Sequence, residues 1–123
     1  MMKATLIALL TLLILTSGCT NVTEQDMELG RKALETGDPS HCAKIGDAMG
    51  KDVCYSTLAS KNKDKKLCEK IDDSQIKDGC FVSLAMISQD PTVCDGISDE
   101  KVAADCTESV KGMSKEVMAA LVE

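Results

Sequence analysis

The residues best suited to chemistry in this chain are its cysteines, which number seven among 123 residues. Six of them, at positions 42, 54, 68, 80, 94 and 106, are separated by 12, 14, 12, 14 and 12 residues, which is a period of 26. Structural zinc sites use Cys pairs two to four residues apart, and redox dithiols and haem attachment use Cys-x-x-Cys. Because the shortest spacing here is twelve residues, the pattern favours structural disulfides.

Other residue types that could act in catalysis or bind metal have simpler interpretations. The single His, His41, lies at the repeat position that Leu67 and Val93 occupy in later copies, and no activated nucleophile accompanies it. The repeated Asp residues 47, 73 and 99 are read as helix caps, and Asp52 and Asp78 as a solvated face. Met27, Met49, Met86, Met113 and Met118 are scattered, which is more typical of core filler than of a copper site. We therefore predict no catalytic residue, no cofactor and no metal ligand.

Composition restricts the possible partners. Aromatic residues make up 2% of the chain and the net charge is −6. Few stacking surfaces and an acidic balance argue against nucleic acid. Seven Cys in so short a chain indicate an oxidising compartment.

The rest of the sequence follows the period of the cysteines. Residues 38–63, 64–89 and 90–115 form three copies, each of which starts with Asp. In every copy, Ile stands three residues after the first Cys and Asp two residues further on, and Leu or Val stands four residues after the second Cys. Agreement at so many positions identifies an internal repeat.

Each copy predicts two short helices. Asp38-Pro39 and Asp90-Pro91 place a cap before a Pro at the first helical position, and the Asp after each Ile offers a cap for the second helix. Residues 23–36 predict a further helix that Thr23 caps and Gly37 ends, and residues 114–122 an amphipathic last helix. The predicted fold is all-α: a short α-solenoid of three 26-residue disulfide-stapled helical hairpins with flanking cap helices.

The repeat also limits the disulfide pairing. Back-to-back packing of the two helices of a copy would bring their mid-helix cysteines to a Cα separation of roughly 5–6 Å. This favours Cys42–Cys54, Cys68–Cys80 and Cys94–Cys106. The main rival pairs Cys54 with Cys68 and Cys80 with Cys94, and leaves the first and last of the six unpaired.

The first nineteen residues have the layout of a secretory signal, with Lys3 before an apolar run and then small residues. The run is shorter than the roughly 20 residues that span a membrane. Its ending, Leu15-Thr16-Ser17-Gly18-Cys19, resembles the lipobox of prokaryotic lipoproteins, with Thr16 where Leu is usual. The resemblance implies cleavage after Gly18 and lipidation of Cys19. It divides the chain into a signal peptide (1–18), a tether (19–23) and a helical repeat domain (24–123). Asn21 in the tether also fits a glycosylation sequon.

The repeats resemble Cys-containing helical repeats in archaeal and bacterial lipoproteins, a resemblance that covers residues 38 to about 115 and implies no activity. We expect a non-enzymatic lipoprotein, anchored on the extracytoplasmic side of the cell membrane, that serves as an interaction or envelope scaffold. Its expected partners are the membrane, through Cys19, and an unidentified protein or envelope component. The alternative is an exported lipoprotein that binds a small ligand or metal ion.

Overall fold

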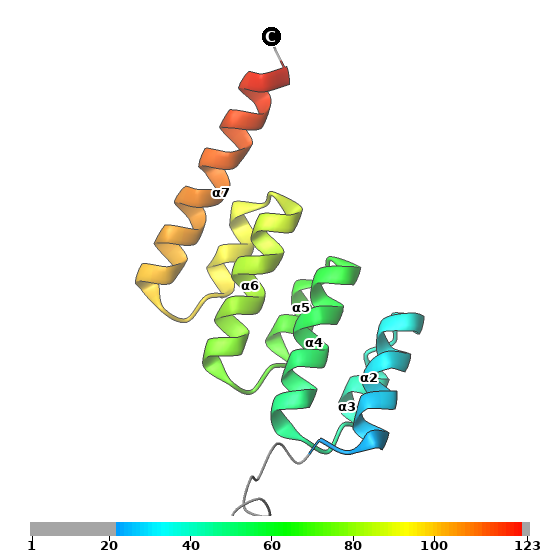
Figure 1. Ribbon diagram of the computed structural model, residues 1–123. Helices are drawn as coiled ribbons and strands as arrows, with labels where there is room; N and C mark the ends of the chain where they lie inside the picture. The colour runs from blue at the N-terminus through cyan, green and yellow to red at the C-terminus, as the bar shows by residue number, and fades with distance from the viewer. Residues whose placement is uncertain (1–21, 122–123) are drawn as a thin grey trace, which may run out of the picture.

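The chain forms helices connected by short turns. The computed structural model describes residues 22–121, and within this range it contains no strand, which confirms the all-α prediction. Long and short helices alternate along the chain (Figure 1). Their bounds are α2 Glu24–Thr36, α3 Ser40–Ala43, α4 Ala48–Asn62, α5 Lys65–Glu69, α6 Ser74–Ser88, the 3-10 helix η1 Pro91–Gly96, and α7 Glu100–Leu121.

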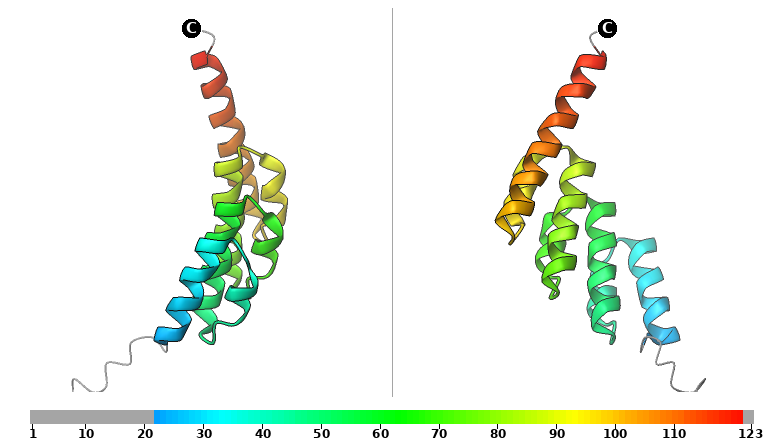
Figure 2. Two further views of the ribbon diagram at one scale, coloured as in Figure 1. Left: turned by 90° about the vertical axis from the view of Figure 1, so that its right-hand side faces the viewer. Right: turned by 60° about the vertical axis from the view of Figure 1, so that its left-hand side comes forward.

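The helices are arranged in two layers. The long helices α2, α4, α6 and α7 lie side by side in chain order, and each contacts the next. The short helices α3, α5 and η1 lie on one side of this layer, as the turned view in Figure 2 shows. Each predicted copy therefore forms one hairpin of a short and a long helix, while α2 takes the place of a long helix before the first hairpin.

The long helices start and end at equivalent repeat positions. The side chain of Asp47 accepts a hydrogen bond from the Gly50 N–H (2.7 Å). Asp73 and Asp99 cap α6 and α7 in the same manner, which confirms the predicted caps. The backbone then turns through left-handed residues at Gly37, Lys63 and Gln89, which are 26 residues apart. Between these signals α4 and α6 have the same length of 15 residues.

The short helices are less regular than predicted. The first begins at Ser40, and Pro39 precedes it instead of forming its first turn. Asp38 nevertheless accepts a hydrogen bond from the Ser40 N–H (2.9 Å). In the third copy the segment is a 3-10 helix, with Pro91 in its first turn as predicted. Helices of four to six residues are unstable alone, so contacts with the long helices must hold them.

The predicted last helix is not separate. The sequence predicted a helix at residues 114–122 after the third copy, whereas α7 runs without a break from Glu100 to Leu121. Position 115 would correspond to the left-handed turn at Lys63 and Gln89. It is followed by Glu116 in place of the capping Asp and by strong helix formers without Pro, so nothing stops the helix. The prediction for α2 is confirmed, with a capping box at Thr23 and a left-handed Gly37.

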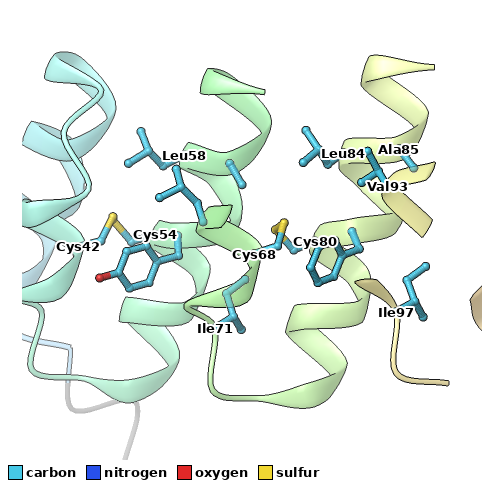
Figure 3. Close-up of a cluster of buried hydrophobic side chains, with 14 of the residues drawn as sticks. Cys42, Cys54, Leu58, Cys68, Ile71, Cys80, Leu84, Ala85, Val93 and Ile97 are labelled. Carbon is cyan, nitrogen blue, oxygen red and sulfur yellow. A yellow bond between two sulfur atoms is a disulfide. The ribbon is translucent and has the colours of Figure 1, made fainter. Parts of the chain in front are cut away.

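The core is a thin layer between the two layers of helices (Figure 3). Leu58, Leu84 and Val110, one from each copy, are fully buried. The Ile residues that follow the short helices, 45, 71 and 97, close the layer at one end. At the α6–η1 contact the ring of Phe81 packs directly on the backbone of Gly96, where a Cβ atom would lie 2.7 Å from Phe81 Cδ1.

Candidate functional site

The three disulfides join the predicted pairs of cysteines. Each links a short helix to the second turn of the following long helix, and the Cα atoms of the pairs lie 5.6, 5.6 and 6.0 Å apart. All six residues are buried. The pairs are Cys42–Cys54, Cys68–Cys80 and Cys94–Cys106.

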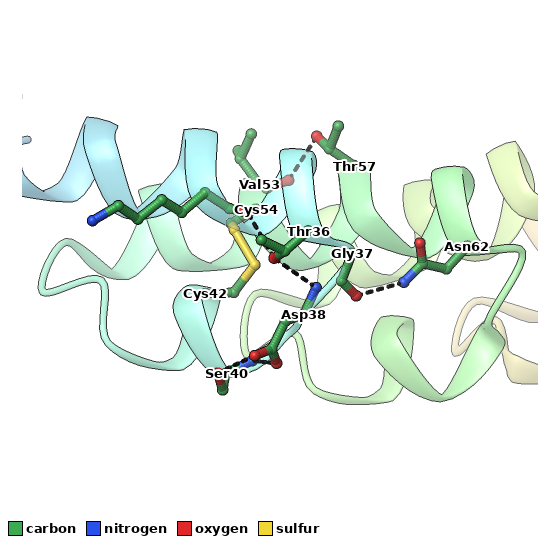
Figure 4. Close-up of a disulfide and its surroundings, with 10 residues drawn as sticks. Thr36, Gly37, Asp38, Ser40, Cys42, Val53, Cys54, Thr57 and Asn62 are labelled. Carbon is green, nitrogen blue, oxygen red and sulfur yellow. Dashed lines mark hydrogen bonds between the residues drawn. A yellow bond between two sulfur atoms is a disulfide. The ribbon is translucent and has the colours of Figure 1, made fainter.

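These bridges act within hairpins and leave the contacts between hairpins to other groups. Around the first bridge, the Asn62 side chain donates a hydrogen bond to the Gly37 carbonyl (3.0 Å), so the end of α4 holds the turn after α2 (Figure 4).

Among residues 22–121 no three His, Cys, Asp or Glu side chains come together as a metal site would require. All six cysteine sulfurs of this part of the chain form disulfides.

Aspartates connect one hairpin to the next, which corrects their interpretation as a solvated face. The Asp52 side chain, only 4% exposed, accepts hydrogen bonds from the backbone N–H groups of Asp72 (3.1 Å) and Asp73 (2.9 Å). One repeat later, Asp78 accepts bonds from Ser98 (2.9 Å) and Asp99 (3.4 Å). The carboxylates on α4 and α6 thus each hold the loop before the next long helix.

Asp26 extends this series by one step toward the N-terminus. It stands 26 residues before Asp52, and its side chain accepts a hydrogen bond from the Gly46 N–H (2.8 Å). Asp26 also completes the capping box of α2, because its side chain accepts a hydrogen bond from the Thr23 N–H (3.2 Å). The signal in the sequence is the 26-residue spacing of these three Asp residues, which begins before the first repeat copy. We call Asp26, Asp52 and Asp78 the aspartate ladder.

Hydrogen bonding stabilises the charged form of the first ladder residue. The bond from Gly46 is the main cause that lowers the pKa of the Asp26 carboxyl below its ordinary value of 3.8, and bonds from Thr23 add to it. Burial acts in the opposite direction. This contact between α2 and the first hairpin is therefore stronger when the carboxyl is ionised.

The ladder ends at α7. Ala104 stands at the ladder position of the third copy, and Thr107 and Lys111 replace the aromatic residue and the Ala of the earlier copies. Ala104, Thr107 and Lys111 line a shallow open hollow on the face where a further hairpin would pack. This face has no ladder carboxylate to hold a further hairpin, and it carries the charged residues Glu108 and Lys111.

His41 has little surrounding chemistry. It is half-buried on α3, and its side chain interacts electrostatically with Asp38. The pKa of that carboxyl is lowered, chiefly by the backbone and side-chain hydrogen bonds from Ser40 and only slightly by His41. The position fits the predicted substitution of a core residue at the edge of the first hairpin.

The interpretation of the methionines as core filler is wrong for three of them. Met27 and Met49 are 61% and 64% exposed, and Met113 is 36% exposed. Met86 does pack against the core. The side chain of Met118 lies outside the described residues.

The N-terminal predictions also fall outside the described residues: the signal peptide at 1–18, lipidation of Cys19 and the sequon at Asn21. In the part of the chain that the structure describes, no helix has the length and apolar character needed to cross a bilayer. Comparison with known proteins adds no relative: no family model, no curated protein and no solved structure matches this chain.

Proposed function

We propose that the protein is a non-enzymatic scaffold, attached through a lipid on Cys19 to the extracytoplasmic face of the cell membrane, which presents a rigid helical surface to another protein or an envelope component. The observation that carries the proposal is the burial of all six repeat cysteines in three intrahairpin disulfides. Such bridges form and persist in oxidising compartments. The lipobox-like ending at Cys19 supplies the anchor.

Rigidity supports the scaffold function. Each hairpin is fixed internally by a disulfide, and consecutive hairpins are fixed to each other by ladder carboxylates. The stack of long helices leaves one broad side exposed, because the short helices cover only the other (Figure 2). Stacked helical repeats bind partners through such extended surfaces with little ordering cost.

The first test is the intact mass of protein extracted from membranes of its native host, before and after reduction and alkylation. We expect a mass of residues 19–123 plus lipid, with six thiols labelled only after reduction. An unmodified Cys19 would refute the anchor. Thiols labelled without reduction would refute the disulfide scaffold.

The partner is sought by crosslinking on intact membranes, with wild type compared with a Cys68→Ala/Cys80→Ala variant. A partner that needs the rigid surface should be captured less by the variant at equal protein levels. A several-degree rise in melting temperature with one divalent ion or small ligand, without a crosslinked partner, would favour the exported ligand-binding alternative instead.

A further inference from the structure

An apolar groove lies between α2 and α4, near the N-terminal ends of both helices. Its volume is about 210 Å³. The apolar side chains that line it come from the chain just before α2, from both helices and from the loop between α3 and α4, and two glycines form part of its wall. Its main lining residues are Val22, Met27, Gly30, Ile45, Gly50 and Val53.

The groove exists because side chains are missing at this interface. Gly50 stands where the later copies have Ile76 and Val102. At the next interface Ile76 is half-buried and packs against the core. Gly30, on the α2 side, likewise stands where Ser56 follows one repeat later. The first interface alone therefore combines two glycines at these positions.

Exposed apolar side chains lie in and beside the groove. Seven large apolar side chains are exposed among the described residues, and four of them gather at this end: Val22, Met27, Met49 and Val53. Met49 and Val53 are four residues apart on α4 and share a face. We call these four residues the N-terminal apolar patch. Exposed apolar side chains gathered beside an apolar groove in this way usually mark a contact site.

The position of the anchor indicates what covers the patch. Val22 belongs to the patch and follows Cys19 by three residues, which span about 11 Å at most. A lipid on Cys19 would keep Val22 within about that distance of the membrane whenever the protein is anchored. A second copy of the chain is a less suitable partner for the patch. The helix α2 beside it carries the ion pairs Arg31–Glu35 and Lys32–Glu28.

We propose that the N-terminal apolar patch rests on the surface of the lipid bilayer and inserts its side chains among the lipids. This inference rests on the proposed lipid anchor at Cys19. The first turns of α2 and α4 then face the membrane, while the C-terminal end of α7 lies at the opposite end of the molecule (Figures 1 and 2). The anchored protein would hold one fixed orientation instead of moving freely on its tether.

Methionine oxidation tests this contact with an internal control. The lipidated protein is reconstituted in vesicles of its native lipids and treated with chloramine-T, which is charged and stays outside the bilayer. Peptide mass spectrometry gives the oxidation rate of each Met. Compared with a Cys19→Ser chain produced without its signal peptide and kept in solution, Met27 and Met49 should oxidise several-fold more slowly, while Met113, at the far end, should be unchanged.

Variants separate membrane contact from folding. The double variant Met27→Gln/Val53→Thr removes two apolar side chains of the patch and should restore fast oxidation of Met49 in vesicles. The matched control is Ile87→Thr, which changes an equally exposed apolar residue near the other end of the long helices and should leave Met49 protected. Melting temperatures of both variants should equal that of the wild type, since all three side chains are exposed.

Two results would overturn the inference. Equal oxidation of Met27 and Met49 in vesicles and in solution, for protein whose mass includes the lipid, would refute the contact and leave the anchor intact. Protection in the soluble chain that increases with protein concentration would assign the patch to a second copy. A mass without lipid refutes the anchor itself, and so is distinguishable from both.

Discussion

Removal of the central ladder carboxylate is the most informative perturbation of this fold. Asp52→Ala eliminates hydrogen bonds to two backbone N–H groups, those of Asp72 (3.1 Å) and Asp73 (2.9 Å). Hydrogen bonds to a charged group contribute about 1.5–3 kcal/mol each. Because Asp72 and Asp73 are exposed, water can reach the abandoned N–H groups and offset part of this loss. We expect the free energy of unfolding to fall by about 2–3 kcal/mol, equivalent to roughly 10–20 °C in melting temperature for a domain of this size.

Equilibrium urea unfolding with the disulfides intact measures the effect. Asp78→Ala is the matched variant, since Asp78 is more exposed than Asp52 and one of its bonds is long (3.4 Å). Its expected loss is about 1 kcal/mol. Asp95→Ala, on the exposed surface of η1, controls for the change in net charge and should stay within about 0.5 kcal/mol of wild type.

The order of the stability losses among the three variants tests this reasoning. If Asp52→Ala unfolds at the same urea concentration as the Asp95→Ala control, the ladder bonds do not hold the hairpins together. Losses of equal size for Asp52→Ala and Asp78→Ala would show that burial and bond length do not set the magnitude. A markedly changed dependence on urea would indicate that the variant loses part of the fold separately.

Three further predictions concern packing, disulfides and acid. Gly96→Ala should lower the free energy of unfolding by about 1–3 kcal/mol, because the new Cβ would overlap the ring of Phe81. Gly79→Ala on α6, where a Cβ meets no other atom, should raise it by up to about 1 kcal/mol. Urea midpoints of the two variants that move in the same direction would contradict this reasoning. The Cys68→Ala/Cys80→Ala variant should lose roughly 3 kcal/mol, and a thermal transition unchanged from wild type would argue against a structural role for that bridge. Because hydrogen bonds lower the pKa of Asp26, its contribution to stability is complete above the ordinary pKa of 3.8 and is lost as the pH falls through the lower folded value. Melting temperature measured from about pH 5 to pH 2 should thus fall more in wild type than in Asp26→Asn, and equal slopes would refute this origin.

Local signals made much of the fold predictable. The capping Asp residues act on N–H groups two or three residues away, and the left-handed turn at Gly37 acts on its own helix. The period of the cysteines restricted their pairing, because equivalent helices must meet in equivalent ways. These features depend on short stretches of chain whose partners are close in sequence.

The ladder could not be recognised from one copy alone. Asp52 follows Lys51 on a helix and resembles any surface residue there, since its partners lie 20 and 21 residues further along the chain. The exposed Met27 and Met49 were misjudged for a related reason. Their burial depends on whether another helix packs over them, and a sequence read one segment at a time does not show that.

The sequence by itself determined the helical class, the 26-residue period and the helix caps, because each depends on local hydrogen bonding or on repetition; for the cysteines it favoured one pairing over a rival, and the structure decided between them. Only the tertiary structure decided which polar groups are buried, that α7 continues through residue 115, and where the open apolar groove lies. Those properties follow from which surfaces the stacked hairpins bring together, and no single segment contains that information.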